Sequence, residues 1–252
     1  MFRDVPKKYH PAGFELLFED QDIIVGNKAP GLLTVAAQWN RDRTVHAALN
    51  EYVRKGSAKS RKEVFVVHRL DQDTSGVLIF AKTEAALNSL KNAWPTFSKT
   101  YLAVVHRHPK EKKGTISSYL KEDELYKVHS SSIEEAQSRA VYEEEDPGKL
   151  ATTDYEVLAE SPKFSLLKVN LKTGRKNQIR VHLAELGHPV VGDKKYGPKE
   201  VANRDLMLHA WKLEINHPFN KKRLSFVAQP PRYLQVLVPW DGYSGAGVPE
   251  QT

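Results

Sequence analysis

The sequence predicts an α+β fold built on a mixed, largely antiparallel central sheet with flanking helices and loops. Apolar runs of strand length outnumber the amphipathic helical segments, and several of them follow one another without a helix between them. No repeat, low-complexity tract or linker interrupts the chain. We therefore expect one domain over residues 1–240, followed by a flexible tail over 241–252.

The N-terminal segment combines short apolar strands with turn formers. An expected hairpin joins residues 16–18 to 23–25, and Pro30 with its following glycine breaks the chain before a short strand at 32–35. A helix should begin at Thr44 as N-cap, because the apolar side chains that follow it share one helical face.

A basic loop at 55–62 leads into a second expected hairpin with apolar flanks at 64–67 and 77–80. A helix at 84–94 should end at Pro95, and an apolar strand follows it.

The segment 106–150 is polar and predicts an insertion of short hairpins and loops. A helix is expected at 176–186, with Gly187 placed to end it. The remaining strands are expected at residues 152–158, 164–171, 206–215 and 224–228.

The composition is that of a globular protein with a basic surface. The 252 residues are 40% hydrophobic and 27% charged, with a formal net charge of +7. This excess favours a polyanionic partner, and the basic residues cluster at 54–62, 106–113, 175–180 and 194–199. The chain has no cysteine, which excludes disulfides and thiol catalysis and fits a reducing cytoplasm.

One turn carries side chains suited to chemistry. It lies within the segment Val64-Phe65-Val66-Val67-His68-Arg69-Leu70-Asp71-Gln72-Asp73-Thr74-Ser75-Gly76-Val77-Leu78-Ile79-Phe80. Loops at strand ends are common positions for reactive groups. Asp71 is a candidate nucleophile or base, although an ordinary polar hairpin connection fits the spacing equally well.

This segment resembles the catalytic loop of RluA-type pseudouridine synthases, in which His-Arg-Leu-Asp precedes Thr-Ser-Gly and an apolar strand. Further stretches resemble the same family in the expected order, so the likeness spans residues 15–235. These stretches are Glu19-Asp20, Lys28-Ala29-Pro30-Gly31, Ser98-Lys99-Thr100-Tyr101-Leu102-Ala103-Val104-Val105, Thr173-Gly174-Arg175-Lys176-Asn177-Gln178-Ile179-Arg180-Val181-His182-Leu183, Gly187-His188-Pro189, Gly192-Asp193-Lys194-Lys195-Tyr196-Gly197 and Leu208-His209-Ala210-Trp211.

The resemblance implies the pseudouridine synthase fold and an enzyme that isomerises uridine in RNA. The reaction breaks the N1–C1′ bond and joins C5 to C1′ without redox change, energy source or water, so we expect no cofactor. Asp71 is the implied catalytic carboxylate, as nucleophile at C1′ or as base at C2′. Arg180 is the implied cation that keeps this carboxylate ionised. Tyr101 is implied to stack on the target uracil and to assist removal of the C5 proton.

Five further residues are candidates for contacts to RNA. Arg69 can fill the space left when the target uridine leaves its stack. For His68, the role of a hydrogen-bonded loop residue fits the sequence at least as well as the role of an RNA contact. Arg175 is a candidate phosphate contact, and Lys176 fits either that role or a plain surface lysine. Gln178, in the same motif, is grouped with them.

The chain departs from the family in two respects. It carries Lys176-Asn177 where Thr-His is the commoner pattern, which bears on substrate contacts. Many relatives also have an N-terminal S4 RNA-binding domain, for which the residues before the first expected strand leave no room. We therefore expect a stand-alone catalytic domain, and the family likeness favours a monomer.

An isomerase acting on structured ribosomal or transfer RNA is the leading hypothesis. A non-catalytic RNA-binding or RNA-assembly factor is the alternative, and a glycoside hydrolase would need a second acid at suitable distance. The histidines lack the spacing of helical metal ligands, so no metal site is expected.

Overall fold

The computed structural model describes residues 11–36, 44–55, 57, 59–142, 146–198 and 205–245. The chain forms two compact units. The first comprises residues 1–99, 209–231 and 242–252, and the second comprises residues 100–208 and 232–241. The prediction of a single domain over residues 1–240 stays a prediction.

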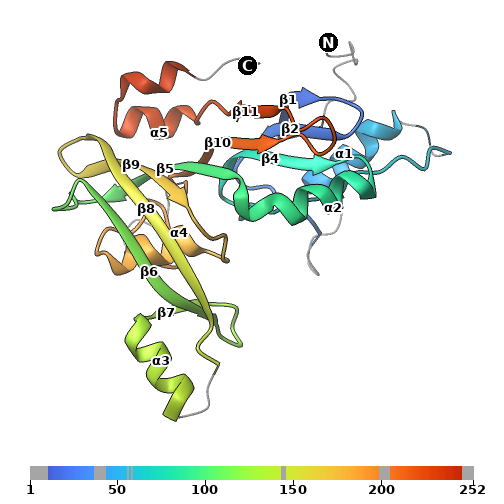
Figure 1. Ribbon diagram of the computed structural model, residues 1–252. Helices are drawn as coiled ribbons and strands as arrows, with labels where there is room; N and C mark the ends of the chain where they lie inside the picture. The colour runs from blue at the N-terminus through green and yellow to red at the C-terminus, as the bar shows by residue number, and fades with distance from the viewer. Residues whose placement is uncertain are drawn as a thin grey trace. The chain divides into compact units, whose positions relative to one another are not determined.

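The first unit is built on a mixed sheet (Figure 1). Its strands are β1 (Phe14–Glu19), β2 (Ile23–Lys28), β4 (Ser75–Ala81) and β10 (Leu208–Asn216) in this order, with β3 (Phe65–Val66) on β4 and β11 (Arg223–Val227) on β10. β4 and β10 are parallel and the other pairs are antiparallel. All of β4 is buried, as expected of a strand covered on both faces.

Two helices of the first unit begin at threonine caps. Thr44 precedes α1 (Val45–Arg54) and Thr83 precedes α2 (Glu84–Ala93), and each hydroxyl accepts a hydrogen bond of 3.1 Å from a backbone N–H in the first turn. The predicted start of a helix at Thr44 is therefore confirmed. Leu90 of α2 packs into the hydrophobic core that also contains side chains of β2 and β4.

The second unit is built on an antiparallel sheet in the order β5-β9-β8-β6-β7. Val181 of α4 packs against apolar side chains of β6, β7 and β8, and Figure 1 shows β6 and β8 as a long ribbon. The elements are β5 (Ser98–His106), which begins in the first unit, β6 (Lys113–Glu122), β7 (Val128–Ser131), α3 (Ile133–Tyr142), β8 (Lys149–Glu160), β9 (Phe164–Leu171), α4 (Gln178–Glu185) and α5 (Arg232–Leu237).

The predicted α+β class with a mixed, largely antiparallel sheet is confirmed. None of the helices in the described part of the chain is long and apolar enough to cross a membrane.

Several local predictions were wrong. Residues 32–35 form no strand and contribute only an isolated bridge from Leu33 to Thr44. The first flank of the Asp71 turn is reduced to the two residues of β3. α3 lies in the segment where short hairpins and loops were expected, and α5 lies in a segment for which no element was predicted. The tail expected over 241–252 stays a prediction: Asp241–Gly245 at its start forms a 3-10 helix, and the rest of that segment lies outside the described residues.

Gly76 allows β4 and β10 to approach each other closely. Its φ is +118°, and a Cβ at this position would lie 2.2 Å from the carbonyl oxygen of Ala210 and 2.5 Å from its nitrogen. Backbone atoms paired within a sheet cannot move aside as the end of a flexible side chain can. Only glycine is therefore compatible with this pairing.

We expect Gly76→Ala to lower the free energy of unfolding by roughly 2 kcal/mol or more, because it combines a steric overlap with an unfavourable φ. Gly174→Ala is the matched control, since its Cβ would meet nothing within 4 Å. Urea unfolding of both variants measures the difference, and equal losses would contradict the steric argument.

Candidate active site

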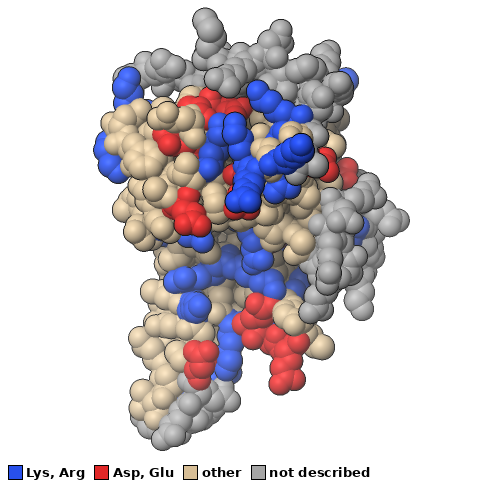
Figure 2. Space-filling view, turned by 90° about the vertical axis from the view of Figure 1, so that its right-hand side faces the viewer, with Lys and Arg blue, Asp and Glu red and all other residues tan. Residues whose placement is uncertain are grey.

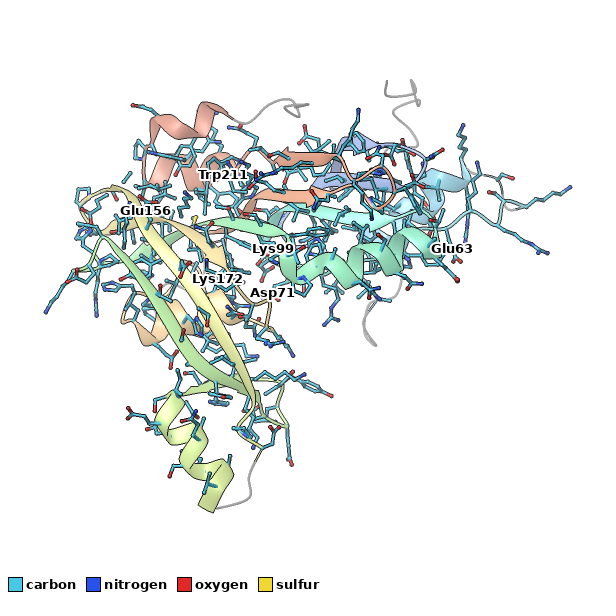
Figure 3. The ribbon with its side chains drawn as sticks, in the orientation of Figure 1. Glu63, Asp71, Lys99, Glu156, Lys172 and Trp211 are labelled. Carbon is cyan, nitrogen blue, oxygen red and sulfur yellow. The ribbon has the colours of Figure 1, made fainter. Side chains whose placement is uncertain are left out.

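The predicted site residues divide between the two units. The first unit contains His68, Arg69 and Asp71, and the second contains Tyr101, Arg175, Lys176, Gln178 and Arg180. Asp71 lies in the loop that precedes β4, and Lys99 lies at the start of β5 (Figure 3).

The backbone on both sides of Asp71 is held by the segment that follows β2. The Thr34 hydroxyl donates to the Leu70 carbonyl at 3.0 Å and accepts from the Leu70 N–H at 3.2 Å. On the other side, the N–H of Gly31 donates to the Gln72 carbonyl at 2.9 Å. The Asp71 carbonyl itself accepts from the Thr74 N–H at 3.2 Å and closes the turn. The half-buried Asp71 is thus placed by a backbone with little freedom.

Lys28 places a fully buried ammonium beneath this loop. Its Nζ donates to the carbonyl oxygens of Ala29, Leu32 and Gln72 at 2.8–2.9 Å, so each of its three protons has an acceptor. Burial lowers the pKa of Lys28 to about 8, and the negative charges of Asp73 and Asp71 oppose this shift. Lys28 therefore supplies positive charge close to Asp71. The sequence placed it in a motif but gave it no role.

His68 is used within the first unit. Its ring stacks on Trp94 with centroids 4.3 Å apart, and its Nε2 accepts a hydrogen bond from the N–H of Ile79 at 3.3 Å. Burial, followed by the charge of Lys99, lowers the pKa of His68 to about 3, so the ring is neutral at pH 7. These contacts favour the interpretation of His68 as a hydrogen-bonded loop residue. A contact from His68 to RNA stays a prediction. Arg69 is exposed, as a contact to RNA requires.

Arg180 is held in a fixed orientation within the second unit. The buried carboxylate of Asp193 accepts from its Nε at 2.8 Å and from its NH2 at 2.7 Å. The Asn177 side chain accepts from NH1 at 3.2 Å, and the guanidinium carbon lies 5.4 Å from the ring centroid of Tyr196. Bidentate pairing of this kind fixes the plane of the guanidinium.

Asp193 is a second residue whose role the sequence did not reveal. Burial acts to raise the pKa of Asp193, but the hydrogen bonds and charge of Arg180 outweigh this effect and hold the pKa below its usual range. The backbone N–H groups of Lys195 and Tyr196 also donate to it. An ionised Asp193 is therefore stable in this buried position, where it orients Arg180.

The other predicted residues of the second unit differ in exposure. Tyr101 is half-buried on β5 opposite Val169 of β9. Arg175 is exposed and donates from Nε to the Leu150 carbonyl at 3.2 Å, whereas Lys176 is exposed and paired with a glutamate.

Gln178 is buried and bonded on both sides of its amide. Its oxygen accepts from the Thr173 hydroxyl and the Arg175 N–H, and its nitrogen donates to the Thr152 carbonyl and the Thr153 hydroxyl. This network favours a role in shaping the loop before α4. A contact from Gln178 to RNA stays a prediction.

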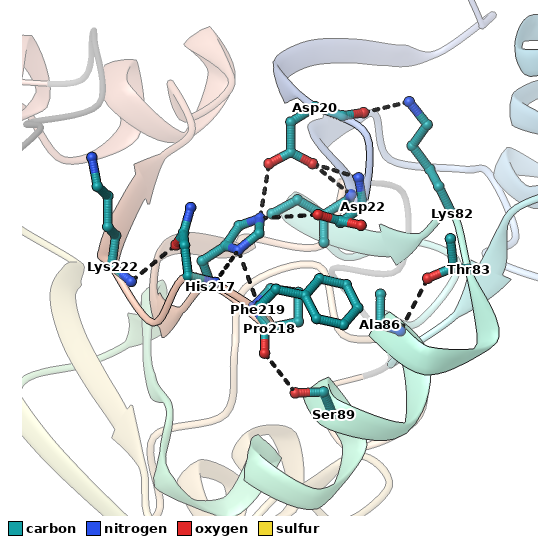
Figure 4. Close-up of polar contacts among 12 residues, drawn as sticks. Asp20, Asp22, Lys82, Thr83, Ala86, Ser89, His217, Pro218, Phe219 and Lys222 are labelled. Carbon is teal, nitrogen blue, oxygen red and sulfur yellow. Dashed lines mark hydrogen bonds and ion pairs between the residues drawn. The ribbon is translucent and has the colours of Figure 1, made fainter.

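One cluster in the first unit resembles a metal site in its side chains (Figure 4). His217 donates from Nε2 to Asp20 at 2.9 Å and lies 3.8 Å from a carboxylate oxygen of Asp22. Its Nδ1 accepts from the N–H groups of Phe219 and Asn220, so the proton of the neutral ring is on Nε2. A metal-bound histidine instead donates from the nitrogen that faces away from the metal. The hydrogen bonds of this cluster therefore order two turns.

Comparison with known proteins assigns the family. The sequence model of the family described as RNA pseudouridylate synthase matches residues 22–185. A relative from Bacillus subtilis, described as an uncharacterized RNA pseudouridine synthase, is 32% identical over 90% of this chain and 73% of its own length. Ribosomal large subunit pseudouridine synthase D of Zymomonas mobilis is 31% identical over 88% of this chain and 71% of its own length. The chain belongs to the RNA pseudouridine synthase family.

The structure agrees with this assignment. Human RNA pseudouridylate synthase domain containing 1 aligns with a TM-score of 0.70 and 25% identity, over 92% of this chain and 88% of that protein. The resemblance to RluA-type enzymes is thereby confirmed, and the protein is an isomerase that modifies RNA. The comparisons leave the roles of individual site residues as predictions.

Each unit contains a buried histidine that is neutral at pH 7. His209 accepts from the Ser75 hydroxyl at 2.8 Å and donates to the Ala228 carbonyl. His182, on the same helix as Arg180, lies between the hydroxyls of Ser118 and Thr153. Both are fully buried, and burial lowers the pKa of each to about 4.

These pKa values predict acid-sensitive stability. An unfolded histidine titrates near pH 6.5, so the stabilisation is complete above that pH and is lost as the pH falls toward 4. At pH 5 each histidine should reduce the free energy of unfolding by about 2 kcal/mol relative to pH 7.5. Urea unfolding at both pH values tests this. His182→Gln should flatten the dependence by about one histidine's share, and an unchanged slope would contradict the assignment.

Proposed function

We propose that this enzyme isomerises uridine in structured ribosomal or transfer RNA, with Asp71 as its catalytic carboxylate. The observation that carries the proposal is the fixed backbone on both sides of Asp71, together with the Lys28 ammonium beneath it. A single carboxylate that must attack C1′ or abstract a proton at C2′ benefits from such preorganisation. In the same proposal Arg180 keeps Asp71 ionised, Tyr101 stacks on the uracil, and Arg69 fills the space that the uridine leaves.

The choice of RNA is supported by charge and by the printed names of relatives. The formal net charge is +7, and Figure 2 shows groups of Lys and Arg side chains, with Asp and Glu among them, on the face turned to the viewer. Relatives from Zymomonas mobilis and Borreliella burgdorferi are named as ribosomal large subunit pseudouridine synthases. We further propose that the protein acts in the cytoplasm, consistent with its lack of cysteine. The family likeness favours a monomer.

The first test is release of tritium from RNA labelled at uracil C5. Wild-type protein should release tritium from ribosomal or transfer RNA. Asp71→Asn should be slower by about 10²–10⁴-fold or more, because it removes the catalytic carboxylate. Asp73→Asn is the matched control. Asp73 is exposed and lies two residues after Asp71, so this substitution removes the same charge nearby. Equal rates for wild type and Asp71→Asn would overturn the role of Asp71. If wild type and Asp71→Asn bind both RNAs and neither releases tritium, a non-catalytic binding factor becomes the better interpretation.

A second test concerns Arg180 and the residue that positions it. Arg180→Met should reduce turnover by about 100-fold while RNA binding persists, because Asp71 loses its cationic partner. Asp193→Asn should reduce turnover by about tenfold, since the guanidinium loses its bidentate acceptor but keeps its charge. Glu160→Gln, which removes an exposed carboxylate of the same unit, serves as the control. Unchanged single-turnover rates in Arg180→Met would exclude Arg180 from the active site.

A further inference from the structure

The turn between β6 and β7, residues 123–127, exposes two adjacent apolar side chains. Leu125 is 85% exposed and Tyr126 is 72% exposed, the highest values for large hydrophobic side chains in the described part of the chain. Exposed aromatic groups in a basic protein are candidates for contacts to nucleic acid.

The turn is ordered by its own hydrogen bonds. One carboxylate oxygen of Asp123 accepts from the N–H groups of Leu125 at 3.0 Å and Lys127 at 2.7 Å. The other oxygen accepts from His129 at 2.7 Å, and the Tyr126 N–H donates to the Asp123 carbonyl at 3.0 Å. The aromatic ring is therefore presented from a fixed backbone and is not carried on a loose loop.

Burial gives no reason for a tyrosine at this position. The φ of Tyr126 is +59°, in the left-handed region that glycine and asparagine adopt more readily than bulky residues. Its ring buries little surface, so packing does not compensate for this conformation. A requirement outside the fold, such as binding, explains the choice of residue better.

Two lysines lie next to Tyr126. The Nζ of Lys176 is 5.3 Å from the ring centroid, and the Nζ of Lys195 donates to the Tyr126 carbonyl. Burial, followed by repulsion from Lys176 and Arg180, lowers the pKa of Lys195. Glu122 and Asp123 balance part of this charge, but an arriving phosphate would relieve the remaining repulsion.

We propose that residues 123–127 form a platform for the substrate RNA, on which Tyr126 stacks an unpaired base and Lys176 and Lys195 bind the adjoining phosphate. Unpaired RNA bases stack on aromatic side chains, and lysines bind the neighbouring backbone. Two apolar side chains are too small a surface for a stable protein partner. The proposal rests on the proposed function, because that function takes RNA as the substrate. The platform adds a contact that helps the enzyme to select its RNA.

Binding is measured by filter retention, separately from turnover, with unmodified ribosomal and transfer RNA transcripts labelled at uracil C5. Tyr126→Ala should weaken binding of the better RNA about tenfold, whereas Tyr126→Phe should stay within about twofold, because stacking needs only the ring. In Tyr126→Ala the change in turnover kinetics should be mainly an increase in KM. Phe219→Ala, at a 50% exposed ring in the first unit, is the matched control and should bind as wild type does. Lys195→Ala should reduce the salt dependence of binding by about one counterion.

Tyr126→Asn separates binding from folding. Asparagine tolerates the left-handed conformation, so this variant should keep or raise Tm while losing RNA affinity. A structural role would instead lower both together. Wild-type affinity in Tyr126→Ala, or no binding of either RNA by wild type, would overturn the platform. Absence of tritium release despite a clear loss of binding in Tyr126→Ala would count against the proposed reaction and leave the platform standing.

Discussion

A single buried charge determines how the loop around Asp71 is built. The ammonium of Lys28 has no exposure, so each of its protons must find an acceptor inside the protein. Its acceptors are three backbone carbonyls, and one belongs to Gln72, the residue after Asp71. Lys28 lies opposite Gly76 in the pairing of β2 with β4, and Gly76 in turn permits the approach of β10. The charge, the strand register and the glycine are therefore interdependent, and a change in any of them displaces the loop.

The second unit solves a similar problem with the opposite charge. Asp193 is a buried carboxylate whose hydrogen bonds come from Arg180 and from two backbone N–H groups. In each unit an ionised group is kept in a low-dielectric environment only because its hydrogen bonds are satisfied. The two groups act differently on the site. Lys28 fixes the backbone next to a carboxylate, whereas Asp193 fixes the side chain of an arginine directly.

The sequence predicted the fold class and the capped helix after Thr44, because both depend on local patterns. It failed where backbone groups are used by distant residues. Residues 32–34 have the apolar pattern of a strand, but their carbonyls accept from Lys28 and from the first turn of α1. The helix α3 was not predicted, although the sequence contains a local signal for its start. Ser132 and Glu135 form a reciprocal capping box. The acidic, polar composition of that segment concealed the signal.

Candidate site residues could be named from motifs, but their roles depend on which hydrogen bonds remain for a ligand. His68 and Gln178 lie in the motifs that carry the family likeness, yet the fold uses their polar atoms through residues far apart in sequence. Tyr126 lies outside every motif. Its ring is exposed at the surface, and its backbone has an unfavourable positive φ. A side chain whose hydrogen bonds are met internally has little left for RNA, whereas an exposed ring has most of its surface available. Motif membership alone therefore does not assign a contact with substrate, and the burial of each side chain has to be considered as well.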